Sequence, residues 1–478
     1  MIAASKRIHL LGRGLILLFT AAIAWTAGAA AEPEQWTGEI ELPGAKLAIF
    51  VDFTTLDDGT ITATIDIPAQ NAMDLALANV VYTDARIEFL IEMAGAAFSF
   101  DRNEDGATAS GTLDQGGMSF PATLRRVTPE EAEAVRPKRP QTPAPPFPYS
   151  TEEVTYRNEA DGITLAATLA TPEGPGPHPA VVFITGSGPQ DRDETIFGHK
   201  PFAVIADHLA RNGIASLRAD DRGVGGSGGS IANSTSRDLA RDAAAGIDFL
   251  ETRTEIDSDR IGLIGHSEGG LIAPIVAADR EDVAFIVLLA GTGVNGREVL
   301  REQLAAVLRV SGVPEATIAA QIEAQQRLLG MLAGDATDDE LREATREMVK
   351  SGAPGLPEES LEQAVNAQLQ QMNSTWFRGF LEYDPKESLR EVNCPVLALN
   401  GSLDVQVLPA QNLPEIKAAL AESNAEDVTI RELEGLNHLF QSATSGSVAE
   451  YATIEQTIDP AVLDLVTDWI RERMMPDS

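Results

Sequence analysis

The first part of the chain alternates apolar and polar residues over short runs. Runs at residues 46–53 and 60–67 have the two-residue period of strands that bury one face, and Asp57-Asp58-Gly59 and Gly116-Gly117 mark turns. Across residues 32–127 this spacing predicts a small β-rich N-terminal domain, built as an antiparallel sheet or barrel. It contains no histidine or cysteine, so we expect a binding or positioning role, or a purely structural one.

Proline dominates the next segment. Residues 128–149 contain seven prolines, a density that favours extended polyproline II and disfavours helix. We expect a semi-rigid linker that connects the β-rich domain to residues 150–478.

After the linker, buried strands alternate with amphipathic helices. Residues 152–157 and 163–170 have the pattern of a hairpin, and apolar runs predict strands at 180–184, 214–218, 261–264, 283–289, 396–399 and 428–433. Helical periods at 200–212, 236–252 and 459–474 lie between or after them. This order predicts an α/β fold with a mostly parallel, doubly wound sheet.

One stretch interrupts the alternation. Residues 295–385 contain helical patterns at 299–310, 317–332, 338–350 and 358–372, and no strand pattern. An insertion beyond the carboxyl ends of the strands would cover the ligand crevice as a lid. Trp376 and Phe377 are then candidates for the wall of a substrate pocket. Packing of these rings onto the sheet, and a helical decoration away from the site, are the alternatives.

The amino terminus has the pattern of an export signal. Lys6, Arg7 and Arg13 precede or flank an apolar run at 15–25, and Ala29-Ala30-Ala31 stand before Glu32. We expect residues 1–31 to be a signal peptide and the protein to be periplasmic or secreted, with an uncleaved anchor as the alternative. No later run would span a membrane after cleavage, and the single cysteine, Cys394, is expected to be a buried, unreactive thiol.

Charge narrows the function classes. The chain has 36 Lys and Arg against 72 Asp and Glu, a formal net charge of −36, and such a field repels nucleic-acid phosphates and anionic lipids. We therefore expect no nucleic-acid partner. No zinc or calcium ligand spacing appears, so neither a metal nor another cofactor is expected.

A serine occupies a strand-to-helix turn. The predicted strand 261–264 leads into Gly265-His266-Ser267-Glu268-Gly269, a G-x-S-x-G sequence in which flanking glycines relieve a crowded turn and the hydroxyl projects above the sheet. Ser267 is therefore the candidate nucleophile.

A serine nucleophile needs a base and an orienting carboxylate, in the chain order Ser, acid, His for such an elbow. Asp404 follows the strand 396–399, and His438 follows the strand 428–433. Of six histidines, His438 alone has the required order and loop context. His199, in a loop after the strand 180–184, is the rival base.

The oxyanion of a tetrahedral intermediate needs backbone N–H donors. We expect one from Glu268, directly after the nucleophile, and the second from Ser187, with Gly188 next, in the small-residue loop after the strand 180–184.

These motifs resemble a known superfamily. The sequences at 186–194, 221–227 and 265–270, together with Trp36-Thr-Gly38, resemble those of secreted bacterial serine esterases of the α/β-hydrolase superfamily, in its dienelactone-hydrolase and serine-aminopeptidase-like branch. The resemblance implies an α/β-hydrolase fold and hydrolysis of small-molecule, short-chain carboxylic esters through Ser267, Asp404 and His438. The chain departs from many relatives in having Thr185 where they have histidine.

Other functions remain open at this point. Peptidase and lactonase activity use the same triad, and a catalytically inactive binding protein can share the fold. Residues 223–228 satisfy G-x-G-x-x-G, but Asp220 and Asp221 precede the glycines and would repel a pyrophosphate, which argues against a nucleotide-binding oxidoreductase. The oligomeric state cannot be read from the sequence.

Overall fold

The computed structural model describes residues 33–42, 45–334, 336–352 and 356–475. The predicted signal peptide lies outside these residues. The chain divides into two compact units, Met1–Lys138 with Ala336–Leu369, and Arg139–Asp335 with Gln370–Ser478. The middle of the predicted insertion is thus grouped with the N-terminal unit.

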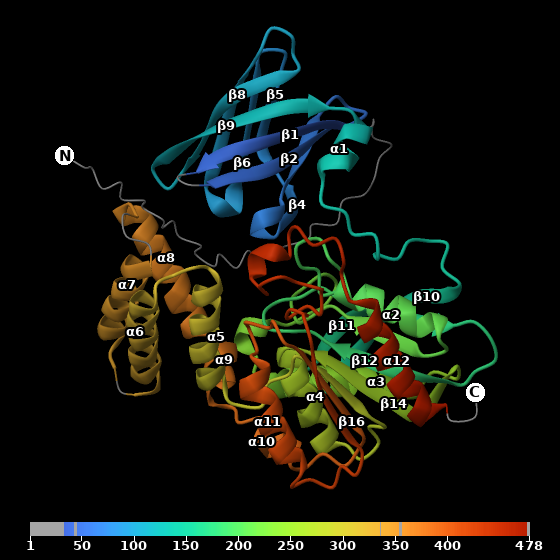
Figure 1. The fold of residues 1–478 in the computed structure, drawn as a ribbon. Coiled ribbons are helices and arrows are strands. Elements are labelled where there is room, and N and C mark those ends of the chain that lie inside the picture. The colour runs from blue at the N-terminus through green and yellow to red at the C-terminus, as the bar shows by residue number, and fades with distance from the viewer. Residues whose placement is uncertain (1–32, 43–44, 335, 353–355, 476–478) are drawn as a thin grey trace. The chain divides into compact units, whose positions relative to one another are not determined.

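The N-terminal unit contains a nine-stranded antiparallel sheet in the order β4-β3-β2-β1-β9-β8-β7-β6-β5 (Figure 1). Trp36, Ile65 and Phe100 are among the alternate residues that bury one face of it, as the two-residue period predicted. Its strands are β1 (Glu34–Leu42), β2 (Ala45–Thr55), β3 (Ile61–Ile67), β4 (Ala72–Ala76), β5 (Ala78–Tyr82), β6 (Arg86–Ile91), β7 (Ala96–Arg102), β8 (Thr108–Gln115) and β9 (Met118–Val127).

The start of the linker is helical. Helix α1 (Pro129–Val135) begins at Thr128, whose side chain accepts the N–H of Glu131 while the Glu131 carboxylate accepts the N–H of Thr128. This capping box, with proline at the first helical position, stabilises the helix. The expectation that residues 128–149 disfavour helix is therefore wrong at this end.

The rest of the linker packs on the second unit. The Arg139 guanidinium donates to the backbone carbonyls of Phe197, Ala452 and Ile454, and the Gln141 amide donates to that of Ile458. These bonds hold residues 139–141 on the rest of the second unit.

The second unit contains an eight-stranded sheet in the order β10-β11-β13-β12-β14-β15-β16-β17. The first two strands form the predicted antiparallel hairpin, β11 also pairs antiparallel with β13, and the remaining pairs are parallel. The strands are β10 (Tyr149–Asn158), β11 (Ile163–Pro172), β12 (His178–Ile184), β13 (Ala215–Ala219), β14 (Ile256–His266), β15 (Ile286–Leu289), β16 (Val396–Gly401) and β17 (Val428–Leu433).

Helices cover both faces of this sheet (Figure 1). One core packs α3 (Ser236–Glu251), α4 (Glu268–Asp279) and α11 (Pro409–Leu420) onto it, and another packs α2 (Pro201–Arg211) and α12 (Pro460–Met474) onto the opposite face. Burial on both faces explains why β12 is an unbroken apolar run after its first two residues. Since the chain passes from β12 to β13 and then returns to β14, the order reverses between β12 and β14, where such folds bind ligands.

The insertion is helical, as predicted. Its described helices are α5 (Gly296–Val310), α6 (Glu315–Ala333), α7 (Asp338–Gly352), α8 (Glu358–Met372), α9 (Thr375–Glu382) and the short α10 (Lys386–Leu389). Arg346 pairs with both Glu358 and Glu362, which joins α7 to α8.

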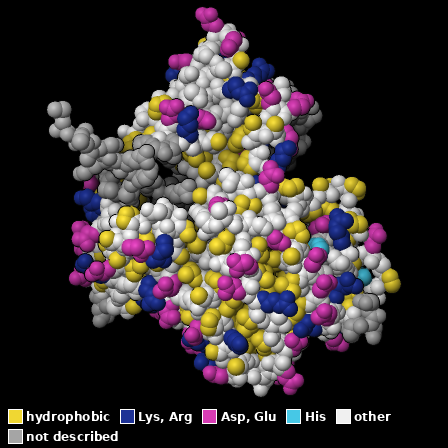
Figure 2. Space-filling view, viewed as in Figure 1, with side chains coloured by type: hydrophobic (Ala, Val, Ile, Leu, Met, Phe, Trp, Pro, Cys, Tyr) yellow, Lys and Arg dark blue, Asp and Glu magenta, His cyan; other side chains and the backbone are white. Residues whose placement is uncertain are grey.

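On the face that Figure 2 shows, Asp and Glu lie among Lys and Arg and do not gather in one place. In the described part of the chain, no helix is long and apolar enough to cross a membrane.

Candidate active site

Ser267 lies at a strained elbow between β14 and α4. Its φ is +54°, a conformation that non-glycine residues rarely adopt, and its N–H donates to the carbonyl of Leu289 at 2.8 Å. A Cβ at Gly265 would lie 2.0 Å from the oxygen of Gly269, and one at Gly269 would lie 2.1 Å from the oxygen of Ile184. The two glycines of the motif are thus required by close backbone contacts, and they let the turn project its serine at the carboxyl ends of the strands.

Asp404 and His438 are joined by a short hydrogen bond. Asp404 follows β16 and His438 follows β17, and Nδ1 of the imidazole lies 2.7 Å from Oδ2 of the carboxylate. The other carboxylate oxygen accepts the N–H groups of Gln406 and Val407 at 2.8 and 2.9 Å, and Asn400 donates to Oδ2 at 3.0 Å. This carboxylate is therefore held by four donors, and it fixes the orientation of the ring.

His266 connects the elbow to the loop of His438. Its Nε2 lies 3.0 Å from the carbonyl oxygen of His438, and the two rings pack with their centroids 4.7 Å apart. The Ser267 hydroxyl itself makes no hydrogen bond to a described residue, so the structure brings the elbow beside His438 without a Ser267–His438 bond. Such catalytic bonds frequently tighten only when substrate is bound.

The predicted oxyanion donors flank the elbow. Glu268 is the first residue of α4, where a backbone N–H has no partner within the helix. Across from it, Gly186 N–H donates to Oε1 of Glu194 at 2.7 Å and is occupied. Ser187 and Gly188 therefore stay the candidates for the second donor, and Gly188 has the positive φ of +91° that suits glycine.

Asp221 also holds the loop that carries Ser187 and Gly188. Its carboxylate accepts the Thr185 hydroxyl at 2.7 Å and the Gln190 N–H at 2.9 Å. Burial raises the pKa of Asp221 well above its usual range, and the nearby Glu194 and Glu268 carboxylates add to the shift. Thr185 thus has a defined partner.

The Glu268 side chain is a feature that sequence reasoning missed. It is buried and accepts the Ser236 hydroxyl at 2.8 Å and the Trp376 indole N–H at 3.0 Å. Burial raises its pKa, and these donors, with the Ser187 hydroxyl, act in the opposite direction. Trp376 also stacks on Phe380, and Phe377 is buried. Of the two rings proposed for the pocket wall, Trp376 is therefore held beside the nucleophile by its bond to Glu268. Contact of Trp376 and Phe377 with substrate stays a prediction.

Comparison with known proteins places the chain in a family. Residues 161–428, more than half of the chain, match the profile of the X-Pro dipeptidyl-peptidase (S15) family. The chain belongs to this family. The matched region includes Ser267 and Asp404 and ends before His438. Membership agrees with the observed sheet and elbow, and the protein is a hydrolase of the α/β-hydrolase superfamily.

Individual proteins are also similar to this S15-family chain. It is 25% identical to esterase EstD of Thermotoga maritima over 379 residues, which is 79% of each protein. It is 32% identical to the uncharacterized protein PA2218 of Pseudomonas aeruginosa over 149 residues, 29% of this chain and 38% of that one. Similar solved structures include PA2218 (TM-score 0.44, 19% identity, 70% and 96% coverage) and the Pyrococcus furiosus esterase Pf2001 (TM-score 0.44, 14% identity, 71% and 98% coverage).

The rival base of the S15-family chain is fully engaged elsewhere. His199 is buried, with Nδ1 2.9 Å from the Thr457 hydroxyl and Nε2 3.0 Å from both the Tyr451 carbonyl and the Gln441 amide. Burial lowers the pKa of His199 to about 4. Both ring nitrogens join segments of the fold, which argues against His199 as the base.

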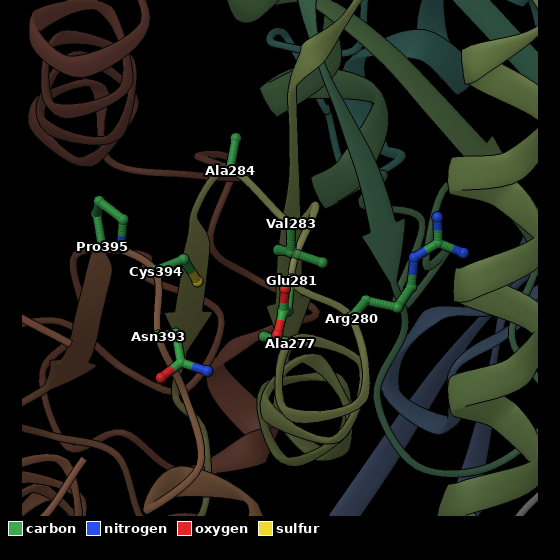
Figure 3. A pocket seen from close by; sticks show the side chains of 8 residues that line it. All are labelled: Ala277, Arg280, Glu281, Val283, Ala284, Asn393, Cys394 and Pro395. Atoms are coloured by element: carbon green, nitrogen blue, oxygen red, sulfur yellow. The ribbon is translucent and has the colours of Figure 1, made fainter. Parts of the chain in front are cut away.

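A hollow lies at the other end of the sheet (Figure 3). Val283 and Ala284 precede β15, and Cys394 and Pro395 precede β16. They line the hollow where strands begin, whereas Ser267 and Asp404 follow strand ends. Burial raises the pKa of Cys394 to about 12, which leaves the thiol protonated and unreactive. No group of three or more His, Cys, Asp or Glu among the described residues is arranged to hold a metal ion.

The indole of Trp376 gives a testable prediction. Trp376→Phe keeps an aromatic ring on Phe380 but removes the donor to the buried Glu268, so we expect the free energy of unfolding in urea to fall by about 1.5–3 kcal/mol, the contribution of a hydrogen bond to a charged group. KM for a small ester should rise as well, because α9 is displaced.

Trp469→Phe is the matched control. Its indole donates to the neutral Thr429 hydroxyl at 3.2 Å, so we expect a loss of only about 0.5–1.5 kcal/mol and an unchanged KM. Equal effects of the two substitutions on KM would contradict the role of Trp376 beside the nucleophile.

Proposed function

We propose that the protein is a carboxylesterase in which Ser267 is the nucleophile, His438 the general base and Asp404 the residue that orients the base. The observation that carries this proposal is the 2.7 Å bond between Asp404 and His438, at strand ends next to the elbow. Substrates are small-molecule esters with short acyl groups.

The reaction follows from these positions. Ser267 Oγ attacks the ester carbonyl as Nε2 of His438 takes its proton, while Asp404 holds the proton on Nδ1. The N–H groups of Glu268 and of Ser187 or Gly188 stabilise the oxyanion at the helix amino terminus. His438 then protonates the leaving alcohol, and water hydrolyses the acyl-enzyme by the same steps.

Peptidase activity is the second candidate, and the family match favours testing it. X-Pro dipeptidyl peptidases cleave an amide, and the same triad serves amide and ester cleavage. Esterase EstD, similar over 79% of the chain, supports the ester. Lactonase activity would use the same residues, and an inactive binding protein would use none of them.

The test is a comparison of substrates on one preparation. We expect a burst of p-nitrophenol from p-nitrophenyl acetate or butyrate, with an amplitude of one per active site, and slower release of p-nitroaniline from Xaa-Pro-p-nitroanilides. A fluorophosphonate should modify Ser267, as mapped by mass spectrometry of peptides. Faster cleavage of the anilides than of the esters would show that the protein is a peptidase. Absence of covalent modification by the fluorophosphonate would reject both the esterase and the peptidase proposal.

We also propose that residues 1–31 direct export. Export predicts a mature protein that begins at Glu32 and is recovered from the periplasm or medium. A full-length chain retained with membranes would contradict cleavage.

A further inference from the structure

The buried carboxylate of Glu194 and the buried imidazole of His266 connect the loop after β12, which carries the candidate oxyanion donors, to the loop that carries His438. Oε1 of Glu194 accepts the N–H of Gly186 at 2.7 Å and lies 2.9 Å from Nδ1 of His266. Nε2 of His266 lies 3.0 Å from the carbonyl oxygen of His438. The loop at residues 185–188 (the oxyanion loop), the elbow at Ser267 and the loop of His438 are thus joined by one chain of hydrogen bonds.

The partners determine where protons must lie. A backbone carbonyl only accepts, so Nε2 of His266 carries a proton. An ionised Oε1 of Glu194 and an unprotonated Nδ1 of His266 are both acceptors, so their 2.9 Å contact needs a proton between the two atoms. An ionised Glu194 beside a neutral His266 would bring two lone pairs together. The pair therefore holds one proton more than that state, most simply as carboxylate and imidazolium.

The surroundings show that this arrangement is imposed by the fold. Glu194 and His266 are 4% and 6% exposed, and Glu194 has a φ of +53°. Its second oxygen, Oε2, is buried without a hydrogen-bond partner among the described residues. An unfavourable backbone conformation and an unsatisfied oxygen both cost free energy, and such outliers concentrate at functional sites.

We infer that Glu194 and His266 are a positioning pair, which sets the oxyanion loop and the His438 loop at a fixed separation as long as it keeps its shared proton. This inference rests on the proposed function. Through Gly186 the pair directs the adjoining Ser187 and Gly188 amides, and through the His438 carbonyl it places the base. Neither residue touches the reacting atoms.

The pair should make kcat fall at alkaline pH. Burial opposes the charge on His266, but the Glu194 carboxylate outweighs it, and the pKa of His266 is raised. Asp404 acts in the same direction, Asp221 faces Glu194, and the His438 ring packs on His266. As pH rises through the pKa of His266 the shared proton is lost, the contact with Glu194 becomes repulsive, and kcat should fall.

Glu194→Gln tests the inference with little change of shape. We expect kcat for a p-nitrophenyl ester to fall by about 10- to 100-fold, the effect of misplacing a reacting geometry by about 1 Å, with KM nearly unchanged. The alkaline limb of kcat should move to lower pH, because the main cause of the raised pKa of His266 is gone. Asp242→Asn is the control, since that largely buried carboxylate pairs with Arg222 away from the elbow, and its pH profile should match wild type.

A spectroscopic measurement separates this inference from the proposed function. Proton NMR of the wild-type protein should show two exchange-protected ring N–H signals that disappear in His266→Gln, and only one should remain in Glu194→Gln. A single ring signal in the wild type that depends on His266, or an unshifted alkaline limb in Glu194→Gln, would overturn the inference. Absence of esterase activity in the wild type would instead reject the proposed function, and the ring signals would still decide the state of the pair.

Discussion

Replacing Ser267 by alanine is expected to lower kcat for a p-nitrophenyl ester by about 10⁶-fold and to abolish the burst, the loss that follows removal of a serine nucleophile in comparable triads. Binding and the oxyanion donors remain, so a residual rate above that of water should persist. The measurement is steady-state and stopped-flow release of p-nitrophenol, with fluorophosphonate labelling of the same samples. The melting temperature should stay close to that of the wild type, because alanine meets the same strain at φ +54° as serine does.

Ser216→Ala is the matched control for this substitution. Ser216 is fully buried on β13, and its hydroxyl has no hydrogen-bond partner among the described residues. Loss of that hydroxyl should leave kcat, KM and labelling unchanged. Turnover by Ser267→Ala within a factor of ten of the wild type would show that another residue is the nucleophile.

The regular elements of the second unit could be predicted because their patterns are local. Buried parallel strands appear as short apolar runs, and helices such as α2 and α3 show a 3.6-residue period, so the predicted 200–212 and 236–252 lie within a residue of Pro201–Arg211 and Ser236–Glu251. Helix α1 was missed because a count of prolines ignores position. Pro129 stands at the first helical residue, where its missing N–H costs nothing, and Thr128 and Glu131 supply the cap.

Part of the candidate site could be predicted because its catalytic residues come after the ends of predicted strands. Asp404 and His438 come directly after β16 and β17, and carboxyl ends of parallel strands meet at one edge of the sheet, so their pairing could be expected from order alone. Glu194 could not be assigned in this way. Its contact with Gly186 depends on how the loop folds back over eight residues, and its contact with His266 spans 72 residues of the chain. The sequence alone equally suggests a solvated charged turn.

The side chain of Glu268 illustrates a second limit. Its position after the nucleophile predicts a role for its backbone N–H, and nothing local indicates that its carboxylate is buried. That burial depends on Ser236 at the start of α3 and on Trp376 of α9, 108 residues away. The three buried carboxylates near the elbow, of Glu194, Asp221 and Glu268, are tolerated because each accepts hydrogen bonds from the loops it holds.

Asp404→Asn is expected to lower kcat by about 10⁴-fold while leaving KM almost unchanged, as an amide in this position does when it imposes the wrong imidazole tautomer. Two backbone N–H groups hold Oδ1 of Asp404, so the amide oxygen must stay on that side and the new NH₂ must face His438. Nδ1 of His438 then accepts a hydrogen bond, the ring proton moves to Nε2, and the base can no longer take the proton of Ser267. The measurement is kcat against pH, with Asp66→Asn as a control, because that buried carboxylate belongs to the N-terminal unit and accepts the N–H of Asp74. The control should keep wild-type kinetics. A kcat for Asp404→Asn within tenfold of the wild type would mean that this bond does not set the tautomer, and the assignment of His438 as the base would have to be abandoned.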